Sequence, residues 1–186
     1  GKNAHLMGGM NFEGLLKGAV VRGLLTGAGG FVGRAVQGYL LADARFLLRS
    51  VFRRLPANLP AALEVCVVPE LSPYSKWKEA LVGVDSIVHC AARVHVMSEQ
   101  TVDPLAEFRR VNVEGTLNFA RQAAGAGVRR FVFISSIKVS GENTLPGVPY
   151  VADAQTEPVD PYGISKMEAE QGLRAARPAN LPAFDI

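Results

Sequence analysis

Residues 26–33 read TGAGGFVG and carry glycines at Gly27, Gly30 and Gly33, directly after the apolar run AVVRGLL at 19–25. Where a strand turns through bare backbone into a helix, a phosphate can approach unpaired N–H groups and the positive end of the helix dipole. A glycine turn by itself also fits a tight structural turn that binds nothing. The apolar run before it and the helical pattern after it favour a phosphate-binding turn.

Apolar runs and helical patterns alternate along the rest of the chain. The expected strands are 19–26, 45–52, 63–68, 84–92 and 129–136, and the expected helices are 31–42, 75–83, 103–127 and 160–176. Two of these helices open on Asp-Pro, a good N-cap followed by the residue that best tolerates the first turn. Nearly continuous apolar strands that alternate with helices indicate an α/β fold with a doubly wound parallel sheet.

The composition is that of a globular domain, with 186 residues of which 48% are hydrophobic and 20% charged. The net charge of +3 comes from scattered basic residues, which argues against a nucleic-acid partner. No signal peptide is visible, and no apolar run approaches the ~18 residues of a membrane span. Cys66 and Cys90 lie in apolar runs, so we expect reduced core thiols and no metal site. We expect a soluble, cytoplasmic protein.

The two ends of the chain are interpreted separately. Residues 1–18 read GKNAHLMGGMNFEGLLKG, which has no clear period and looks like a tag or leader. Residues 19–186 make up the predicted domain. The last residues read LPAFDI, where a sixth strand is expected to begin.

Further motifs follow the glycine turn: VHCAA (88–92), VNVEGT (111–116), FISSIKVSG (133–141) and PYGISK (161–166). Together with the TGxxGxxG turn they resemble the extended branch of the short-chain dehydrogenase/reductase superfamily, and within it the NAD-dependent epimerase/dehydratase family. The likeness covers residues 19–186; the chain is similar to UDP-glucose 4-epimerases and more similar still to the nucleotide-sugar 4-ketoreductases of surface-polysaccharide synthesis. It implies a Rossmann fold that binds NAD or NADP.

The resemblance implies that Ser136, Tyr162 and Lys166 are catalytic. Tyr162 and Lys166 are four residues apart and share a helix face, although such a pair alone more often lies on an exposed surface. A neighbouring ammonium favours a phenolate, so we expect Lys166 to lower the pKa of Tyr162 from about 10. Ser136, at a strand end, would hydrogen-bond the reacting oxygen. Ser135 is the alternative for the serine role.

The resemblance also implies which residues meet the cofactor. The expected contacts are Gly27, Gly30, Phe31, Val32, Gly33, Arg53, Glu70, Leu71, Ala91, Ala92, Tyr162 and Lys166. Relatives that prefer NAD carry an acid near position 53, whereas Arg53 or Arg54 can hold a 2′-phosphate. We therefore expect NADP(H) to bind at least as well as NAD(H), with an exposed arginine pair of no cofactor role as the alternative. Glu70 stands where the family has an aspartate that meets the adenine.

Three polar residues near these motifs are expected to be structural. Asn112 is interpreted as a residue of a helix bend that holds water. His89 and His95 flank the strand that lines the cofactor, and no second ligand at metal spacing accompanies them.

The function favoured by the resemblance is hydride transfer at C4 of a UDP-hexose with NAD(P). The protein would act as an epimerase or as a 4-keto-sugar reductase in surface-polysaccharide synthesis. A reductase consumes NADPH, so the arginine at position 53 favours the hypothesis of a reductase. A non-catalytic dinucleotide-binding sensor or scaffold is the alternative.

Members of this family are longer, and their later part contacts the sugar. The substrate-binding part is therefore expected to be truncated, with the C-terminal substrate domain absent. The resemblance implies a UDP-sugar as partner. It also implies a homodimer of the full-length protein, formed through helices near 103–124 and 162–176.

Overall fold

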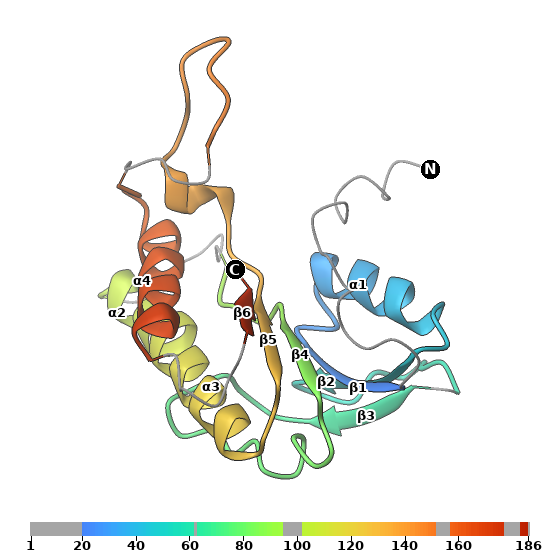
Figure 1. Ribbon diagram of the computed structural model, residues 1–186. Coiled ribbons are helices and arrows are strands. Elements are labelled where there is room, and N and C mark those ends of the chain that lie inside the picture. Colours follow the sequence, from blue (N-terminus) through green and yellow to red (C-terminus); the bar gives the residue numbers. More distant parts are fainter. Residues whose placement is uncertain (1–19, 62, 95–101, 152–156, 177–182, 186) are drawn as a thin grey trace.

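The computed structural model describes residues 20–61, 63–94, 102–151, 157–176 and 183–185. Within these ranges one parallel sheet has the strand order β3-β2-β1-β4-β5-β6 (Figure 1). The strands are β1 Val21–Thr26, β2 Phe46–Phe52, β3 Glu64–Val67, β4 Ser86–His89, β5 Arg130–Phe133 and β6 Ala183–Asp185. The order reverses between β1 and β4, which in doubly wound folds is where a dinucleotide binds. The predicted α/β fold with a doubly wound parallel sheet is confirmed.

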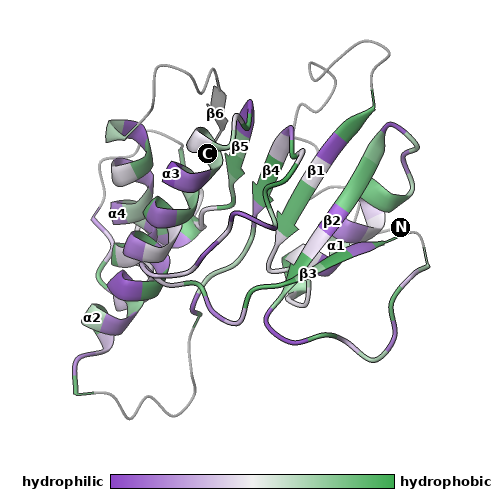
Figure 2. Ribbon diagram, turned by 90° about the horizontal axis from the view of Figure 1, so that it is seen from below, coloured by the Kyte–Doolittle hydropathy of each residue, from purple (hydrophilic) through white to green (hydrophobic). Residues whose placement is uncertain are grey.

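Helices cover both faces of this sheet. They are α1 (Phe31–Leu41), α2 (Pro104–Phe108), the π-helix η3 (Arg109–Gly115), α3 (Thr116–Gly125) and α4 (Pro161–Ala175). Leu24 of β1 packs in the same buried cluster as Phe119 of α3. Leu25, the next residue, packs in a second cluster with Val36 of α1. Because neighbouring strand residues point to opposite faces, α1 and α3 lie on opposite sides of a largely hydrophobic sheet (Figure 2).

Residues 78–83 form successive hydrogen-bonded turns and residues 75–77 have no regular structure, so the predicted helix at 75–83 is wrong. The guanidinium of Arg49, which is buried on β2, donates to the carbonyl oxygens of Ala80 at 2.5 Å and Val82 at 3.0 Å. These backbone acceptors are thus satisfied by a side chain from the sheet and not by a helical ladder. Trp77 remains buried at 2% exposure, so the segment still contributes to the core.

The predicted helix 103–127 is helical throughout most of its length but contains the π segment η3. Asp103 caps it as expected, accepting a hydrogen bond from the Ala106 amide at 3.0 Å. Gly115 lets η3 approach the segment after β3, because a Cβ there would lie 3.0 Å from Cγ of Leu71. A π turn redirects side chains, often near functional sites. Here it carries Asn112.

Strand β5 ends at Phe133, earlier than the predicted strand 129–136. Ser136 instead begins the short 3-10 helix η4 (Ile137–Ser140), and its Oγ accepts a hydrogen bond from the Lys138 amide at 3.3 Å. Ser136 therefore lies just beyond the carboxyl end of β5. The peptide that carries it is free of the sheet ladder and can turn toward α4.

Among the described residues, no helix combines the length and the apolar character that crossing a membrane requires. The predicted tag or leader at 1–18 lies outside the described residues. The division of the chain at residue 19 stays a prediction.

Candidate dinucleotide-binding and catalytic site

The glycine turn between β1 and α1 leaves no room for side chains. Gly27 has φ +71°, and a Cβ on it would lie 2.7 Å from the amide nitrogen of Ala91. A Cβ on Gly33 would lie 2.0 Å from the carbonyl oxygen of Gly27. The turn is closed by the Gly30 amide, which donates to the Gly27 carbonyl at 2.9 Å. Glycine at these positions is required by the packing of the turn itself.

The first turn of α1 is suited to an anion. Gly30 is its N-cap, so no side chain there competes for the first amides, and the first turn holds no acidic residue. Phe31 and Val32 follow, with 87% and 46% of their surface exposed. Bare amides at the positive end of a helix, in a cradle that any Cβ would fill, fit the pyrophosphate of a dinucleotide.

The other predicted cofactor contacts lie at the same edge of the sheet. Arg53 and Arg54 directly follow β2 and are exposed. Ala91 and Ala92 follow β4, where the Ala91 amide donates to Thr26 Oγ1 at 3.2 Å. Because β1, β2 and β4 run parallel, these ends meet at the carboxyl edge, beside the glycine turn.

The two predicted cofactor contacts that follow β3, Glu70 and Leu71, are also partly accessible. Glu70 is exposed, and its carboxylate lies 3.9 Å from the guanidinium of Arg110. Leu71 is half-buried under Gly115. Glu70 is thus already engaged with a charge on η3 at the position where an adenine contact was predicted.

The three predicted catalytic residues meet near the start of α4. Asp160 caps this helix, accepting a hydrogen bond from the Gly163 amide at 2.9 Å, which sets Tyr162 in the first turn. The Ser136 side chain lies close enough to Tyr162 to lower the pKa of the phenol through hydrogen bonding. Ser135, the alternative for the serine role, instead donates to Glu170. These contacts favour Ser136.

Lys166 is buried at 2% exposure one turn further along α4. Its ammonium donates to the carbonyl oxygen of Ile134 at 2.7 Å and lies 3.8 Å from the ring centroid of Phe133. Burial lowers the pKa of Lys166 to about 8, and electrostatic interactions with Cys90 and Glu170 oppose that effect. A buried ammonium of this kind is partly deprotonated near pH 8.

The pKa of Tyr162 is raised from its ordinary value, so the expectation that Lys166 lowers it is wrong for this structure. Burial of the phenol has the largest effect, the hydrogen bond with Ser136 opposes it, and the Asp160 carboxylate adds to it. The physical reason is that the Lys166 ammonium is turned to the Ile134 carbonyl. Tyr162 is therefore a neutral phenol at neutral pH.

Asn112 on η3 joins three segments around this site. Its Oδ1 accepts from the Arg93 amide at 2.7 Å, and its Nδ2 donates to the Arg93 carbonyl at 3.0 Å. Nδ2 also donates to Ser165 Oγ at 2.9 Å, and that hydroxyl donates to the Tyr162 carbonyl at 2.8 Å. Asn112 thus fixes the end of β4 to the first turn of α4. The VNVEGT motif marked Asn112, but nothing in the sequence marked Ser165.

His89 is fully buried, and each of its two ring nitrogens lies beside a threonine hydroxyl. Its Nδ1 lies 2.6 Å from Thr26 Oγ1 and its Nε2 lies 3.0 Å from Thr116 Oγ1. Burial lowers the pKa of His89 to about 3, so the ring is neutral and ties β4 to β1 and α3. Burial also raises the pKa of the Cys90 thiol to about 12. In the described ranges no cluster of three metal-ligating side chains occurs, and His95 lies outside them.

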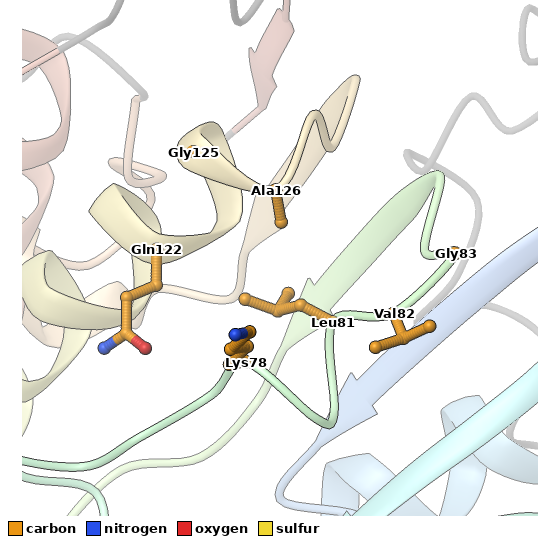
Figure 3. Close-up of a pocket in the computed structure, with 7 residues that line it drawn as sticks. All are labelled: Lys78, Leu81, Val82, Gly83, Gln122, Gly125 and Ala126. Carbon is orange, nitrogen blue, oxygen red and sulfur yellow. The ribbon is translucent and has the colours of Figure 1, made fainter.

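A hollow on the surface lies at the opposite edge of the sheet (Figure 3). It is lined by Lys78, Leu81, Val82, Gly83, Gln122, Gly125 and Ala126. These residues precede β4 and β5, at the amino ends of the strands. The hollow is therefore separate from the candidate site.

Comparisons with known proteins agree with this arrangement. A model of the NAD dependent epimerase/dehydratase family matches residues 23–184. The chain is 41% identical over 152 residues to a UDP-glucose 4-epimerase of Vibrio cholerae, covering 82% of this chain and 46% of that protein. It is 36% identical over 149 residues to a 3-beta-hydroxysteroid dehydrogenase of Mycolicibacterium neoaurum, covering 73% of this chain and 40% of that protein.

Among solved structures, MoeE5 in complex with UDP-glucose and NAD superposes with a TM-score of 0.72 at 27% identity, over 88% of this chain and 52% of that one. The chain spans about half the length of the relatives it matches. The region of this chain that the family model matches contains the glycine turn, Ser136, Tyr162 and Lys166. The chain belongs to the NAD-dependent epimerase/dehydratase family.

Proposed function

We propose that the protein binds NAD(P) at the turn 26–33 and transfers a hydride at C4 of a UDP-hexose. The placement of Ser136, Tyr162 and the buried Lys166 together, at the sheet edge that also carries the glycine turn, is the observation that carries the proposal. The similarity to a UDP-glucose 4-epimerase and to a structure that holds UDP-glucose with NAD supports a nucleotide sugar as substrate. We further expect the enzyme to be cytoplasmic and to dimerise through η3, α3 and α4.

In this mechanism the chain's own residues handle the proton. The bound nicotinamide supplies the hydride acceptor or donor. Tyr162, held neutral by burial, is the proton donor that a sugar ketone needs on reduction. In the reverse direction the base is its phenolate, left after that donation or formed when Tyr162 gives its proton to solvent, and it takes the proton of the hydroxyl. Ser136 donates a hydrogen bond to the same oxygen and stabilises the charge that develops there. Lys166, with a pKa of about 8, can exchange a proton near neutral pH.

Epimerisation at C4 is the first candidate, because the relative that is 41% identical is a UDP-glucose 4-epimerase. Reduction of a 4-keto sugar in polysaccharide synthesis is the second, and the exposed Arg53 and Arg54 favour it because they suit NADPH. The combination of Ser136, Tyr162 and a buried Lys166 favours either over a non-catalytic sensor. Burying a lysine ammonium costs free energy, which fits a residue retained for its chemistry.

The proposed function is tested by following C4 directly. The complete protein is incubated with UDP-glucose deuterated at C4 and with NAD, and the products are followed by NMR. We expect UDP-galactose that keeps deuterium at C4, since the same hydride returns to the other face of the ring. Oxidation of NADPH only with a 4-keto sugar would identify the reductase. Unchanged sugars in every combination of UDP-hexoses, 4-keto forms and both cofactors would contradict the proposal.

Cofactor choice gives a separate prediction. Changing Arg53 and Arg54 together to alanine should weaken NADP binding by about tenfold or more, since hydrogen bonds to charged groups contribute about 1.5–3 kcal/mol. NAD binding should be unaffected, because NAD has no 2′-phosphate. Calorimetric titration with both cofactors measures this, and Arg45→Ala, before the same strand and paired with Asp43, is the control. A parent protein that binds NAD tenfold more tightly than NADP would contradict the role of the arginines.

A further inference from the structure

Three consecutive residues beyond β5 each contact α4. The Ile134 carbonyl accepts from Lys166, Ser135 donates to Glu170, and the Ser136 side chain lies close enough to Tyr162 to lower its pKa. The partners on α4 are separated by four residues, so they lie on one face of the helix. The segment 134–136 is therefore held against α4 at three successive points along the helix. Two of these three contacts involve candidate catalytic residues.

The contact between Ser135 and Glu170 has no part in the proton transfer proposed above. Glu170 is half-buried, and its carboxylate accepts the hydrogen bond of the Ser135 hydroxyl. A charge-assisted hydrogen bond of this kind is about twice as strong as a neutral one. Because Ser135 lies between Ile134 and Ser136, holding it restricts both neighbours.

We propose that Glu170 is a positioning residue, which clamps Ser135 and thereby keeps Ser136 aligned with Tyr162 and the Ile134 carbonyl aligned with Lys166. The inference rests on the proposed function for its catalytic consequence. Its structural core, the link between Glu170 and the surroundings of Lys166, can be measured without substrate or cofactor.

Electrostatics provides the readout that distinguishes this role from a purely structural one. The groups that act on Lys166 are Glu170 on α4, the Phe133 ring on β5, and His89 and Cys90 at the end of β4. His89 and Cys90 are both uncharged near pH 7, given pKa values of about 3 and about 12. Glu170 is thus the carboxylate that raises the pKa of Lys166 against the effect of burial. Removing its charge should lower that pKa further.

The experiment compares Glu170→Gln, Ser135→Ala and their combination with the parent. Glu170→Gln keeps the shape and an oxygen acceptor but removes the charge. The matched control is Glu168→Gln on the same helix, whose carboxylate pairs with Arg109 at 2.6 Å on the surface. Lysines labelled with ¹³C at Cε are titrated by NMR without ligands, and the Lys166 signal is assigned with Lys166→Arg. Urea unfolding verifies that each variant is folded.

We expect a lower titration midpoint for Lys166 in Glu170→Gln and an unchanged midpoint in Glu168→Gln. In the turnover assay, each single change should lower kcat by about tenfold or more, because small misplacements of reacting groups are costly. The double variant should be no slower than the slower single variant, as expected for two residues that act through one contact.

Three outcomes would overturn the inference. An unchanged Lys166 midpoint in Glu170→Gln would show that the carboxylate does not act on Lys166. Additive losses of kcat in the double variant would show that Ser135 and Glu170 act independently. If Glu170→Gln does not fold, Ser135→Ala alone must lower kcat, and an unchanged kcat there would equally overturn it. A parent that turns over no nucleotide sugar would refute the proposed function, while the NMR titration would still decide the link between Glu170 and Lys166.

Discussion

Replacing Tyr162 by phenylalanine is expected to lower turnover by about 10²–10⁴-fold, the usual contribution of a positioned proton donor. The substitution removes only the hydroxyl, whose pKa the nearby Ser136 side chain lowers. The ring keeps its edge contact with Phe108, whose centroid lies 6.2 Å away, so the fold should be retained. Turnover is measured by the deuterium assay at C4, and NAD binding by calorimetry. Binding should persist, because the glycine turn is untouched.

The control for this prediction is Tyr39→Phe on α1, where the tyrosine is 54% exposed and far from Ser136 in the chain. It should leave turnover unchanged. If Tyr162→Phe also leaves turnover unchanged with an active substrate, the phenol has no catalytic role. The non-catalytic dinucleotide-binding reading would then be favoured.

Changing Gly33 to alanine should damage both stability and cofactor binding. The new Cβ would lie 2.0 Å from the Gly27 carbonyl oxygen, which is backbone and can move only if the turn moves. Overpacking of this kind costs about 1–3 kcal/mol. NAD affinity should fall by about tenfold or more, since each 1.4 kcal/mol of distortion is a factor of ten. Urea unfolding and calorimetric titration with NAD measure the two effects.

Gly38→Ala, on the same helix α1, is the matched control. A Cβ at Gly38 meets nothing within 4 Å, and alanine is favoured over glycine in a helix by about 0.8–1.0 kcal/mol. This change should raise the free energy of unfolding and leave NAD binding unaltered. The same chemical change is therefore predicted to have opposite signs at two positions five residues apart. Equal effects at both would rule out close packing of the turn as the cause.

Features decided by local chemistry could be predicted from the sequence. The glycine turn, the Asp103 and Asp160 caps and the alternation of strands and helices depend on neighbours a few residues away. The family motifs added Ser136, Tyr162 and Lys166, which the fold brings to one edge of the sheet. Whether these three act as predicted is for the experiments above to determine.

Features decided by distant partners could not be predicted. The π segment carries Asn112, whose partners Arg93 and Ser165 are 19 and 53 residues away. The turns at 78–83 are held by Arg49, which lies on β2. The pKa of Tyr162 depends on burial, and the spacing of Tyr162 and Lys166 gave no sign that the ammonium would face Ile134. Such contacts appear only when separate elements pack together.

A crystal structure of the protein grown with NAD is the most direct measurement of pyrophosphate binding by the turn 26–33. We expect the diphosphate within hydrogen-bonding distance of the first backbone amides of α1, and the nicotinamide ring beside Tyr162. A nucleotide in the hollow between Lys78 and Gln122 would contradict this (Figure 3). So would the lack of any nucleotide at a saturating concentration of NAD.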